Sequence, residues 1–568
     1  MPYVQTFDRT QMMMCSWDSF VDPESIARLI DAFVDSLDLK KYHVKEVAKE
    51  GRPSYDPRGM YKLYIYGSRK GIRSSRKLED SCKVNLEVKW MMGGAEPDFR
   101  TISEFRKVNI DSLKEIFHEF NRRISEAVEW GFCSVDGSKF LANNSKDNNF
   151  TKNKLDDRIK WLNAHTDEYL RILKDMDEQE DLEETPDNLT RKIVETKLKE
   201  AQERLKKYEG YQKLMEETGA SQLSLTDADA RLMKNKNGFA VAYNPQTAVD
   251  SETHLIRDFE MTNQVTDHGL LDVTMKGIRK ETDGILEVTA DKGYENEEDM
   301  IRCLENGIIP HVITDDGKDG YELEIPYEES ETDRFSESPE EMKKCLYAGK
   351  IPEAYKDVIT EMKVEEVRRK VSDRQPEETA VKSVYGTPEE MQERAKEGYF
   401  VRDPERNLVY CPAGEILRQK CIKKNGNIRY ANKNACKHCK NRNKCYKGKG
   451  EWKEIDFTKD SLEKPCRDWL KAEGKTAENA IRRPEGHFEK FKVVKFFLKP
   501  CVEKTTQRMC LSEHPFGTIK RAMGASYFLL RGLRKVTGEF ALFCLGYNLE
   551  RAKNLLGFQK MMQLMAGV

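Results

Sequence analysis

Two aspartates stand in strand-like segments, where a charged side chain is unusual. Asp136 lies in the middle of the alternating segment 130–141, on a face otherwise made of small polar residues. Asp291 ends a second strand-like segment, 284–291, and in sheets with helical crossovers ligands collect beyond the strand ends. Two aspartates brought together there repel each other unless a cation neutralises them. Because Mg²⁺ is held by a few carboxylates together with waters and phosphate oxygens, the pair predicts a divalent-metal site.

A third acid is needed to hold two ions, and Glu513 is the best candidate. It lies seven residues before Lys520, and if that segment is helical the two side chains face the same side, two turns apart. A carboxylate for metal and a lysine for phosphate on one face would suit a site that handles phosphodiesters. The alternative for any single acid is a solvated surface charge. This alternative fits Asp136 and Asp291 less well than Glu513, because a charge inside or at the end of an apolar strand is rare.

The stretch around Glu513 is strongly basic. Between residues 490 and 535, eleven cations face only two acids. Such an excess beside an acidic metal site predicts phosphate contacts and binding that weakens with salt. The candidates for these contacts are Lys504, Arg508, Lys520 and Arg521. The alternative is a solvated basic helix face.

A second basic cluster lies in the N-terminal part of the chain. Apolar residues recur at helical spacing from about 23 to 123, in short helices joined by turns that contain Gly or Pro. The cations at these joints are Arg69, Lys70, Arg73, Arg76 and Lys77. This pattern resembles a helix-turn-helix region that binds DNA. The alternative is an ordinary helical domain with a solvated basic face.

Four cysteines between 411 and 445 have the spacing of a structural metal site. Cys436 and Cys439 form a C-x2-C pair, which is half of a tetrahedral Zn²⁺ site, and Cys411 and Cys445 could close it. An iron–sulfur cluster uses the same thiolates, and free thiols are the third interpretation. The chain carries 14 cysteines and no export-signal pattern, which favours reduced thiols or metal ligands over disulfides.

Composition limits the classes of protein further. The 568 residues are too many for one core, and the charged fraction of 35% is high beside 38% hydrophobic residues. The net charge of −2 means that any nucleic-acid binding must come from local patches. No apolar run approaches the roughly 20 residues of a membrane span. We therefore expect a multidomain cytoplasmic protein with no membrane partner.

The order of helix and strand patterns predicts an α/β fold, or α+β across several domains. A meander of three strands followed by two βα units, between 130 and 313, favours a mixed sheet with helices on its faces. Residues 401–450 are expected to be loop-like. The predicted domains are a helical domain, 1–125; a first core part, 126–314, with a helical-hairpin insertion at 152–218; an insertion with an acidic linker and the cysteine cluster 411–445, 315–485; and a second core part, 486–568, with Glu513.

Five motifs occur in an order that resembles bacterial insertion-sequence transposases of the DDE type. They are Ser134-Val-Asp136-Gly-Ser138, Leu225-Thr-Asp-Ala-Asp-Ala-Arg-Leu232, Tyr243-Asn-Pro-Gln-Thr-Ala-Val-Asp250, Ala290-Asp291-Lys-Gly-Tyr294 and Glu513-His-Pro-Phe-Gly-Thr-Ile-Lys520. The resemblance implies a ribonuclease-H-like core and a catalytic triad of Asp136, Asp291 and Glu513. It also implies two Mg²⁺ ions, with Mn²⁺ as a substitute, and recognition of terminal inverted repeats in double-stranded DNA.

One part of the resemblance does not fit. Related transposases often carry a Tyr and an Arg before the Glu, the Arg with three residues between. Here Arg508 has four residues between it and Glu513, and Thr505 stands at the position of the Tyr. Lys520 fits the pattern, so the mismatch concerns the phosphate contact of Arg508 and not the assignment of the acids.

The resemblance implies strand cleavage by water at the ends of the element, followed by attack of the freed 3′-hydroxyl on target DNA. The alternatives are a domesticated relative that binds DNA without cutting it and a nuclease of the same core without strand transfer. We expect a homodimer on paired ends, in the bacterial cytoplasm and associated with the nucleoid. The hairpin at 152–218 would either form dimer contacts or pack only on itself.

Overall fold

The computed structural model describes residues 10, 12, 14–42, 44, 54–144, 148–180, 188–235, 238–315, 318–370, 387–423, 426–446, 450–458, 461–476 and 488–567. The chain forms two compact units. The first contains Met1–Glu365 together with Val493–Val568, and the second contains Glu366–Lys492. In the described part of the chain, no helix is both long enough and apolar enough to cross a membrane.

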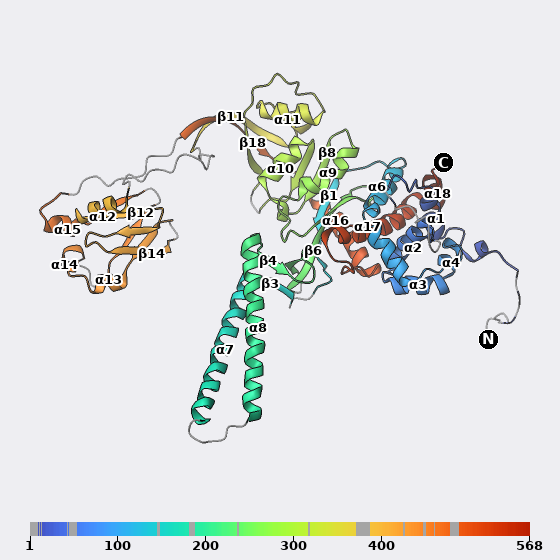
Figure 1. Cartoon of the computed structure of the whole chain (residues 1–568). Helices are drawn as coiled ribbons and strands as arrows, with labels where there is room; N and C mark the ends of the chain where they lie inside the picture. Colours follow the sequence, from blue (N-terminus) through green and yellow to red (C-terminus); the bar gives the residue numbers. More distant parts are fainter. Residues whose placement is uncertain are drawn as a thin grey trace, which may run out of the picture. The chain divides into compact units, whose positions relative to one another are not determined.

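The first unit is built on a mixed sheet with the strand order β7-β6-β1-β8-β9. Figure 1 labels β6, β1 and β8 of this sheet. Its strands are β1 (Cys133–Gly137), β6 (Gly238–Asp250), β7 (Ile256–Thr262), β8 (Leu286–Ala290) and β9 (Ile308–Val312). β1, β6 and β7 pair antiparallel, whereas β8 and β9 run parallel to β1. The parallel strands require crossovers, which the helices α9 (Leu271–Glu281) and α10 (Glu297–Glu305) supply. The predicted order of three antiparallel strands and two βα units is confirmed.

The two faces of this sheet carry different side chains. Val135 and Val288 point into an apolar core that they share with Met275 of α9 and Met300 of α10. Because side chains alternate along a strand, Asp136 and its even-numbered neighbours in β1 face the other way. That second face is covered by α16 (Val502–Gly517), which packs against β1, β6, β8 and β9.

Short helices of the N-terminal region share one hydrophobic core with the C-terminal helices. The elements are α1 (Ile26–Asp35), α2 (Pro57–Arg69), α3 (Ser75–Val84), α4 (Leu86–Met91), α5 (Phe99–Val108), α6 (Ser112–Ser125), the π-helical turn η5 (Thr518–Ala522), α17 (Leu533–Leu556) and α18 (Phe558–Ala566). The short helix η1 (Trp17–Phe20) precedes them and buries none of its residues. The middle of α17, residues 538–549, is buried on all sides, and its sequence there is correspondingly apolar. Two short strands, β2 (Phe140–Leu141) and β5 (Arg231–Asn235), extend the sheet along β6.

Local sequence signals set the ends of several of these helices. Pro57 takes the first position of α2, where its missing N–H costs nothing, and the side chain of Asp56 accepts a hydrogen bond from the next free amide. The carboxylate of Asp98 caps α5 in the same way, by accepting from the backbone of Arg100 and Thr101.

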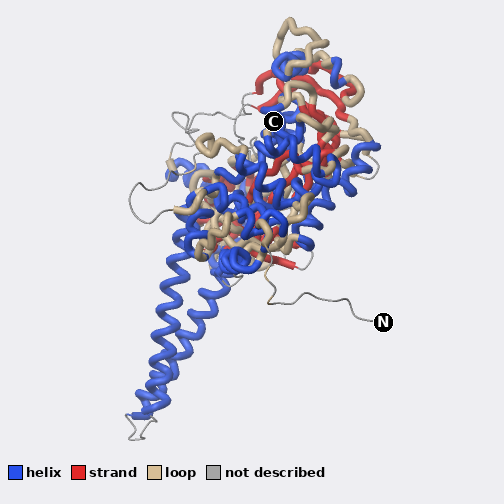
Figure 2. Tube along the Cα trace, turned by 90° about the vertical axis from the view of Figure 1, so that its right-hand side faces the viewer, coloured by secondary structure: helices blue, strands red, loops and turns tan. Residues whose placement is uncertain are grey.

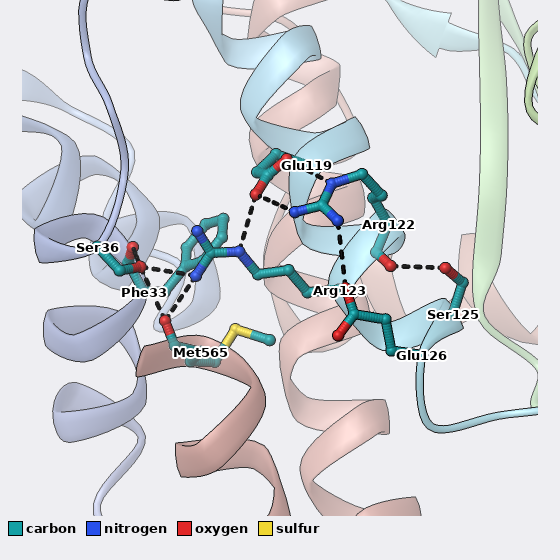
Figure 3. Close-up of polar contacts among 8 residues, drawn as sticks. All are labelled: Phe33, Ser36, Glu119, Arg122, Arg123, Ser125, Glu126 and Met565. Carbon is teal, nitrogen blue, oxygen red and sulfur yellow. Dashed lines mark hydrogen bonds and ion pairs between the residues drawn. The ribbon is translucent and has the colours of Figure 1, made fainter. Parts of the chain in front are cut away.

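Polar contacts also join the two ends of the chain. The guanidinium of Arg123 in α6 donates to Ser36 Oγ and to the carbonyl of Met565 in α18, both at 2.6 Å (Figure 3). Its Nε donates to Glu119 at 2.9 Å. The helices of residues 1–125 therefore belong to the same unit as the sheet, whereas the sequence was interpreted as giving them a domain of their own.

A pair of long antiparallel helices occupies the predicted insertion at 152–218. These are α7 (Lys152–Glu180) and α8 (Asn188–Thr218), and the short strands β3 (Asn149–Thr151) and β4 (Gln222–Ser224) pair at their base. Figures 1 and 2 show the two helices side by side. A small apolar cluster of Phe150, Leu155 and Met215 holds the base together.

Residues 318–365 belong to the first unit, although the sequence analysis placed them in an insertion that begins at 315. They form β10 (Tyr321–Pro326), α11 (Pro339–Tyr347), η4 (Glu353–Tyr355) and the start of β11 (Ile359–Lys370). β10 and β11 form a three-stranded sheet with β18 (Phe488–Leu498), which lies between them. Leu323 and Leu346 join the same core as the central sheet. The acidic residues of this segment lie on its outside, which is why composition alone indicated a linker.

The second unit is a six-stranded antiparallel sheet in the order β16-β15-β14-β13-β12-β17. Its elements are α12 (Pro388–Lys396), β12 (Tyr399–Asp403), β13 (Leu408–Tyr410), β14 (Ile416–Ile422), β15 (Ile428–Ala431), α13 (Lys433–Lys437), α14 (Arg442–Cys445), β16 (Glu454–Phe457), β17 (Glu463–Pro465) and α15 (Arg467–Ala472). The expectation that residues 401–450 are loop-like was wrong. These strands are short and partly exposed, so their alternation is weak in the sequence.

Candidate active site

Asp136 and Asp291 lie side by side at the carboxyl ends of two neighbouring parallel strands. The register of β1 and β8 pairs Ser134 with Thr289, and two further residues along both strands bring Asp136 level with Asp291. Alternation along the strands directs both side chains to the face covered by α16. Proximity of the two aspartates, which the sequence analysis expected, is therefore present in the fold.

The surroundings of Asp136 make its carboxylate costly to ionise. Burial raises the pKa of Asp136 to about 6; the guanidinium of Arg508 lowers this pKa, and the charge of Asp291 raises it. One oxygen of Asp136 accepts a hydrogen bond from the amide of Gly137 at 2.8 Å. Asp291 accepts an equivalent bond from the amide of Gly293, also at 2.8 Å, and so caps the short helix η3 (Lys292–Tyr294).

Helix α16 is anchored over these strands at its beginning. The carboxylate of Glu287 in β8 forms an ion pair with Lys504 and a 2.8 Å hydrogen bond with His311 of β9. The other ring nitrogen of His311 accepts from the amide of Cys501, just before α16, at 3.1 Å. The hydrogen bond and ion pair lower the pKa of Glu287 to about 2. Lys504, a predicted phosphate contact, is therefore engaged in an internal ion pair.

Glu513 lies further along the same helix, with its side chain exposed to solvent. Among the described residues, no three His, Cys, Asp or Glu side chains converge closely enough to hold a metal ion as they are placed. The structure thus brings together Asp136 and Asp291, and it puts Glu513 on the helix that covers them without bringing its carboxylate into a cluster with theirs.

A further acid, Asp267, lies next to the two aspartates and was missed from the sequence. One of its oxygens accepts hydrogen bonds from Asn244 at 2.7 Å and Gln246 at 2.9 Å, and lies 3.3 Å from the Lys139 ammonium. A Cβ on Gly137 would lie 2.8 Å from the same oxygen. Asp267 follows β7 in a loop with no periodic pattern. The polar side chains inside β6 were the available signal, since buried polar groups need partners.

Comparison with known protein families shows which family the chain belongs to. Residues 15–108 match a family described as "Transposase domain (DUF772)". Residues 210–390 and 410–552 match two families that are each described as "Transposase DDE domain". The chain is an insertion-sequence DDE transposase. Asp291 falls within one of these matches and Glu513 within the other, whereas Asp136 lies outside all three.

DDE transposase domains indicate a DNA-cleaving and strand-transferring enzyme, and the family implies a divalent metal cofactor, typically Mg²⁺. No protein of known function in a curated collection matches the chain. No solved structure matches it either.

The environment of the two aspartates suits a hydrated divalent cation. Thr247 stands opposite Asp136 in the register of β1 and β6, and its buried hydroxyl has no hydrogen-bond partner among the described residues. The same holds for Asn244 Oδ1 and for Nε of Arg508. Oxygen donors around two carboxylates are the ligand set that Mg²⁺ prefers, and its waters could satisfy the orphaned polar atoms.

Lys520 of the transposase lies beside the strand that carries Asp136. Its ammonium donates to Ser138 Oγ at 2.6 Å and to the carbonyl of Lys139 at 3.0 Å. The turn η5 that holds it is π-helical, so the expected α-helical alignment of Glu513 with Lys520 does not apply. Arg521, the other candidate in this turn, is exposed.

The five N-terminal cations differ in how far they are free to meet DNA. Arg73 is mostly covered and is bonded to Glu539 at 2.9 Å, and Arg69 pairs with Glu550 at 2.8 Å. Lys70 is 4.0 Å from a carboxylate oxygen of Glu87. Arg76 and Lys77 are exposed. Arg69 and Arg73 therefore form internal ion pairs with acids of α17, a helix that is distant in the sequence.

The four predicted metal-ligand cysteines line a common cavity in the second unit. Cys411 follows β13, Cys436 lies in α13, Cys439 follows it and Cys445 ends α14. The sequence analysis did not include Cys466, whose sulfur is 3.8 Å from that of Cys445.

Proposed function

We propose that this transposase binds the terminal inverted repeats of its element, nicks the DNA at their ends with the help of Mg²⁺ and joins the freed 3′-hydroxyl to target DNA. The observation that carries the proposal is the lateral placement of Asp136 beside Asp291 on β1 and β8. Because an element has two ends, the proposal includes a dimer that acts on both.

The strand arrangement supports a ribonuclease-H-like core. Three antiparallel strands, β1, β6 and β7, continue into β8 and β9, which are parallel to β1 and joined through α9 and α10. Ligands of such open sheets collect beyond the carboxyl ends of the parallel strands. Asp136 and Asp291 stand at that edge.

The proposed roles follow from the positions of the side chains. Asp136 and Asp291 would bind the metal, and Glu513 would complete the set by turning from solvent towards the strand ends. A bound pair of Mg²⁺ ions supplies activation of the attacking oxygen and stabilisation of the leaving oxygen. Arg508 balances the negative charge around Asp136, as its effect on that pKa indicates. Lys520 would hold a DNA phosphate near the strand ends.

The test is cleavage of labelled duplexes that carry candidate element ends, with Mg²⁺ and mapping of both strands. We expect Asp136→Asn, Asp291→Asn and Glu513→Gln to bind the duplex but to nick it at least 10²-fold more slowly. Glu503→Gln is the matched control, since Glu503 is an exposed acid on the same helix. Normal nicking by either aspartate variant would overturn the assignment. Binding without any nicking by the unaltered chain would favour a silent DNA-binding relative.

A further inference from the structure

Four cysteines of the second unit surround one small cavity. Cys411, Cys436, Cys439 and Cys445 line a space of about 40 Å³, which is too small for an organic cofactor and large enough for a single ion. The remaining walls are largely apolar or aromatic and include Phe400, in the core of the unit. Several thiols that converge on one apolar space are typical of a structural metal site.

The turn that follows Cys411 directs a backbone amide at its sulfur. Gly414 adopts a φ of +86°, which lets its amide donate to the carbonyl of Cys411 at 2.9 Å. The next amide, of Glu415, then donates to the Cys411 sulfur at 3.3 Å. These backbone hydrogen bonds hold the Cys411 sulfur in a fixed position, as partners around metal ligands do.

A fifth cysteine supports the side chain of Cys445. Cys466 is buried, and its thiol donates to the Cys445 sulfur at 3.8 Å. The Lys453 ammonium lies 3.4 Å from the Cys466 sulfur and 2.7 Å from the carbonyl of Cys445. Cys466 does not line the cavity, so we assign it to the shell that orients Cys445 rather than to the ligands.

We propose that the second unit binds one structural Zn²⁺ through Cys411, Cys436, Cys439 and Cys445. Zinc fits better than an iron–sulfur cluster because one ion suffices to fill the cavity, whereas a cluster spreads its thiolates over several irons. As they are placed, these thiols do not yet meet at one point, so binding requires rotation of side chains that already face one space. The core of the unit is small, and a metal would add much of its stability.

The first experiment measures metal in the full-length chain. We expect one zinc per chain by elemental analysis and, after exchange with Co²⁺, the absorption of tetrahedral cobalt thiolate. Cys436→Ser, Cys439→Ser and Cys445→Ser should each lose the ion, while Cys421→Ser, an exposed cysteine of β14, should keep it. Cys466→Ser should also keep a full equivalent but release zinc to a chelator more than tenfold faster.

Several outcomes would overturn the site. Less than 0.2 zinc per chain after growth with zinc, loss of zinc from Cys421→Ser, or loss from Cys466→Ser with retention by Cys445→Ser would each refute the assignment. Stoichiometric iron with sulfide absorption would refute zinc as the metal. If a ligand variant is insoluble, zinc content and cobalt spectra of the unaltered chain still decide whether the site exists.

A second inference rests on the proposed function and concerns Asp267. Its Oδ2 and the Oδ1 of Asp291 lie 3.8 and 2.9 Å from the position that a Cβ on Gly293 would take, which places the two oxygens within 6.7 Å of each other. Its other oxygen is held by Asn244 and Gln246. We infer that Asp267 is a positioning residue for the acids at the strand ends.

The hydrogen bonds around Asp267 extend to η3, the short helix that follows Asp291. Gln246, which donates to Asp267, accepts a hydrogen bond from the hydroxyl of Tyr294, and Tyr294 is fully buried in η3. Lys139 connects the same carboxylate to the loop after β1. Asp267 therefore links the segments that carry Asp136 and Asp291 through fixed donors, as second-layer partners of metal ligands do.

The test is the Mg²⁺ dependence of nicking by Asp267→Asn. We expect the Mg²⁺ concentration for half-maximal nicking to rise 10- to 100-fold with an unchanged thermal midpoint. Asp272→Asn in α9, an acid bonded to Asn306 rather than to Asn244, Gln246 or Lys139, is the control with normal Mg²⁺ dependence. An unchanged Mg²⁺ curve for Asp267→Asn refutes this inference. Normal nicking by Asp136→Asn would refute the proposed function itself, so the two failures are distinguishable.

Discussion

The ammonium of Lys520 donates a 2.6 Å hydrogen bond to Ser138 Oγ, two residues beyond Asp136 on the same strand segment. This bond ties the π-helical turn after α16 to the loop that follows β1, so the two segments that carry Asp136 and Glu513 are joined directly. A half-buried lysine held this close to the strand ends is in place to transfer its hydrogen bonds to a phosphate.

The first prediction follows from that contact. Lys520→Met should reduce nicking about 10²-fold, because one preorganised cation is lost where charge develops. Ser138→Ala should cost less, since Lys520 keeps its bond to the carbonyl of Lys139. Single-turnover nicking rates on one labelled duplex check both. Equal losses in the two variants would mean that the bond itself, rather than the cation, matters.

The N-terminal cations give a second prediction, which separates folding from DNA binding. The ion pair of Arg73 with Glu539 is buried on both sides, with 9% and 3% of the side chains exposed. Arg73→Met should therefore destabilise the fold by about 3–5 kcal/mol, because it leaves a buried charge unpaired. Thermal or denaturant unfolding of the full chain measures this loss.

Lys77 is the matched comparison for Arg73, because it is exposed in the neighbouring helix α3. Lys77→Met should leave unfolding unchanged, weaken duplex binding uniformly across sequences and reduce the salt slope of binding by about one. Titration of binding against salt gives that slope. A Lys77→Met variant with normal DNA affinity would remove Lys77 from the DNA-binding candidates.

A third prediction uses the lowered pKa of Glu287. An acid whose pKa falls to about 2 on folding adds stability above its ordinary pKa of about 4.5, and this stability is lost as the pH falls towards 2. The free energy of unfolding should therefore exceed that of Glu287→Gln by a constant amount above pH 5. The difference should shrink between pH 4.5 and 2.

Denaturant unfolding at several pH values checks this dependence. Glu322→Gln, an exposed acid of β10, is the control whose difference from the unaltered chain should stay small at every pH. A gap for Glu287→Gln that stays the same from pH 6 to pH 3 would show that the ion pair with Lys504 and the bond from His311 do not set that pKa.

The parts of the fold that were predictable are those with a local period. β1 is a mostly apolar strand that contains Asp136, and β8 is one that Asp291 directly follows. Helix α1 buries Ile26, Leu29, Ile30 and Phe33 at helical spacing, so these patterns are visible in a few residues. The pairing of β1 with β8 is non-local. The sequence could suggest that their aspartates meet, but the register that makes them neighbours came only from the structure.

What was missed depends on partners far away in the chain. Asp267 stands in a loop without a period, and its importance arises from donors on β6 and beyond β1. In the sequence, Arg73 and Lys77 are both cations of one basic cluster. Only the packing of α17 over Arg73 distinguishes it from the exposed Lys77. Acidic residues around α11 suggested a linker, yet Met342 and Leu346, four residues apart, bury one face of that helix.

The fourth prediction concerns the shared core of the N-terminal helices and α17. A Cβ added to Gly538 of α17 would lie 2.4 Å from the carbonyl oxygen of Ile110, which is backbone and cannot move aside cheaply. Gly538→Ala should destabilise the first unit by about 1–3 kcal/mol through overpacking. Gly517 is the control, because a Cβ there meets nothing within 4 Å and its φ of −60° is helical.

Gly517→Ala should accordingly stabilise the chain, by about 0.5–1 kcal/mol, since alanine loses less backbone freedom in a helix. Because α17 packs against both α2 and α6, the loss caused by Gly538→Ala should appear in the unfolding of the N-terminal helices and of the sheet together. Hydrogen exchange, followed separately in peptides from α6 and from β8, measures this coupling. Faster exchange confined to α6 would show that residues 1–125 unfold independently, as a separate domain would.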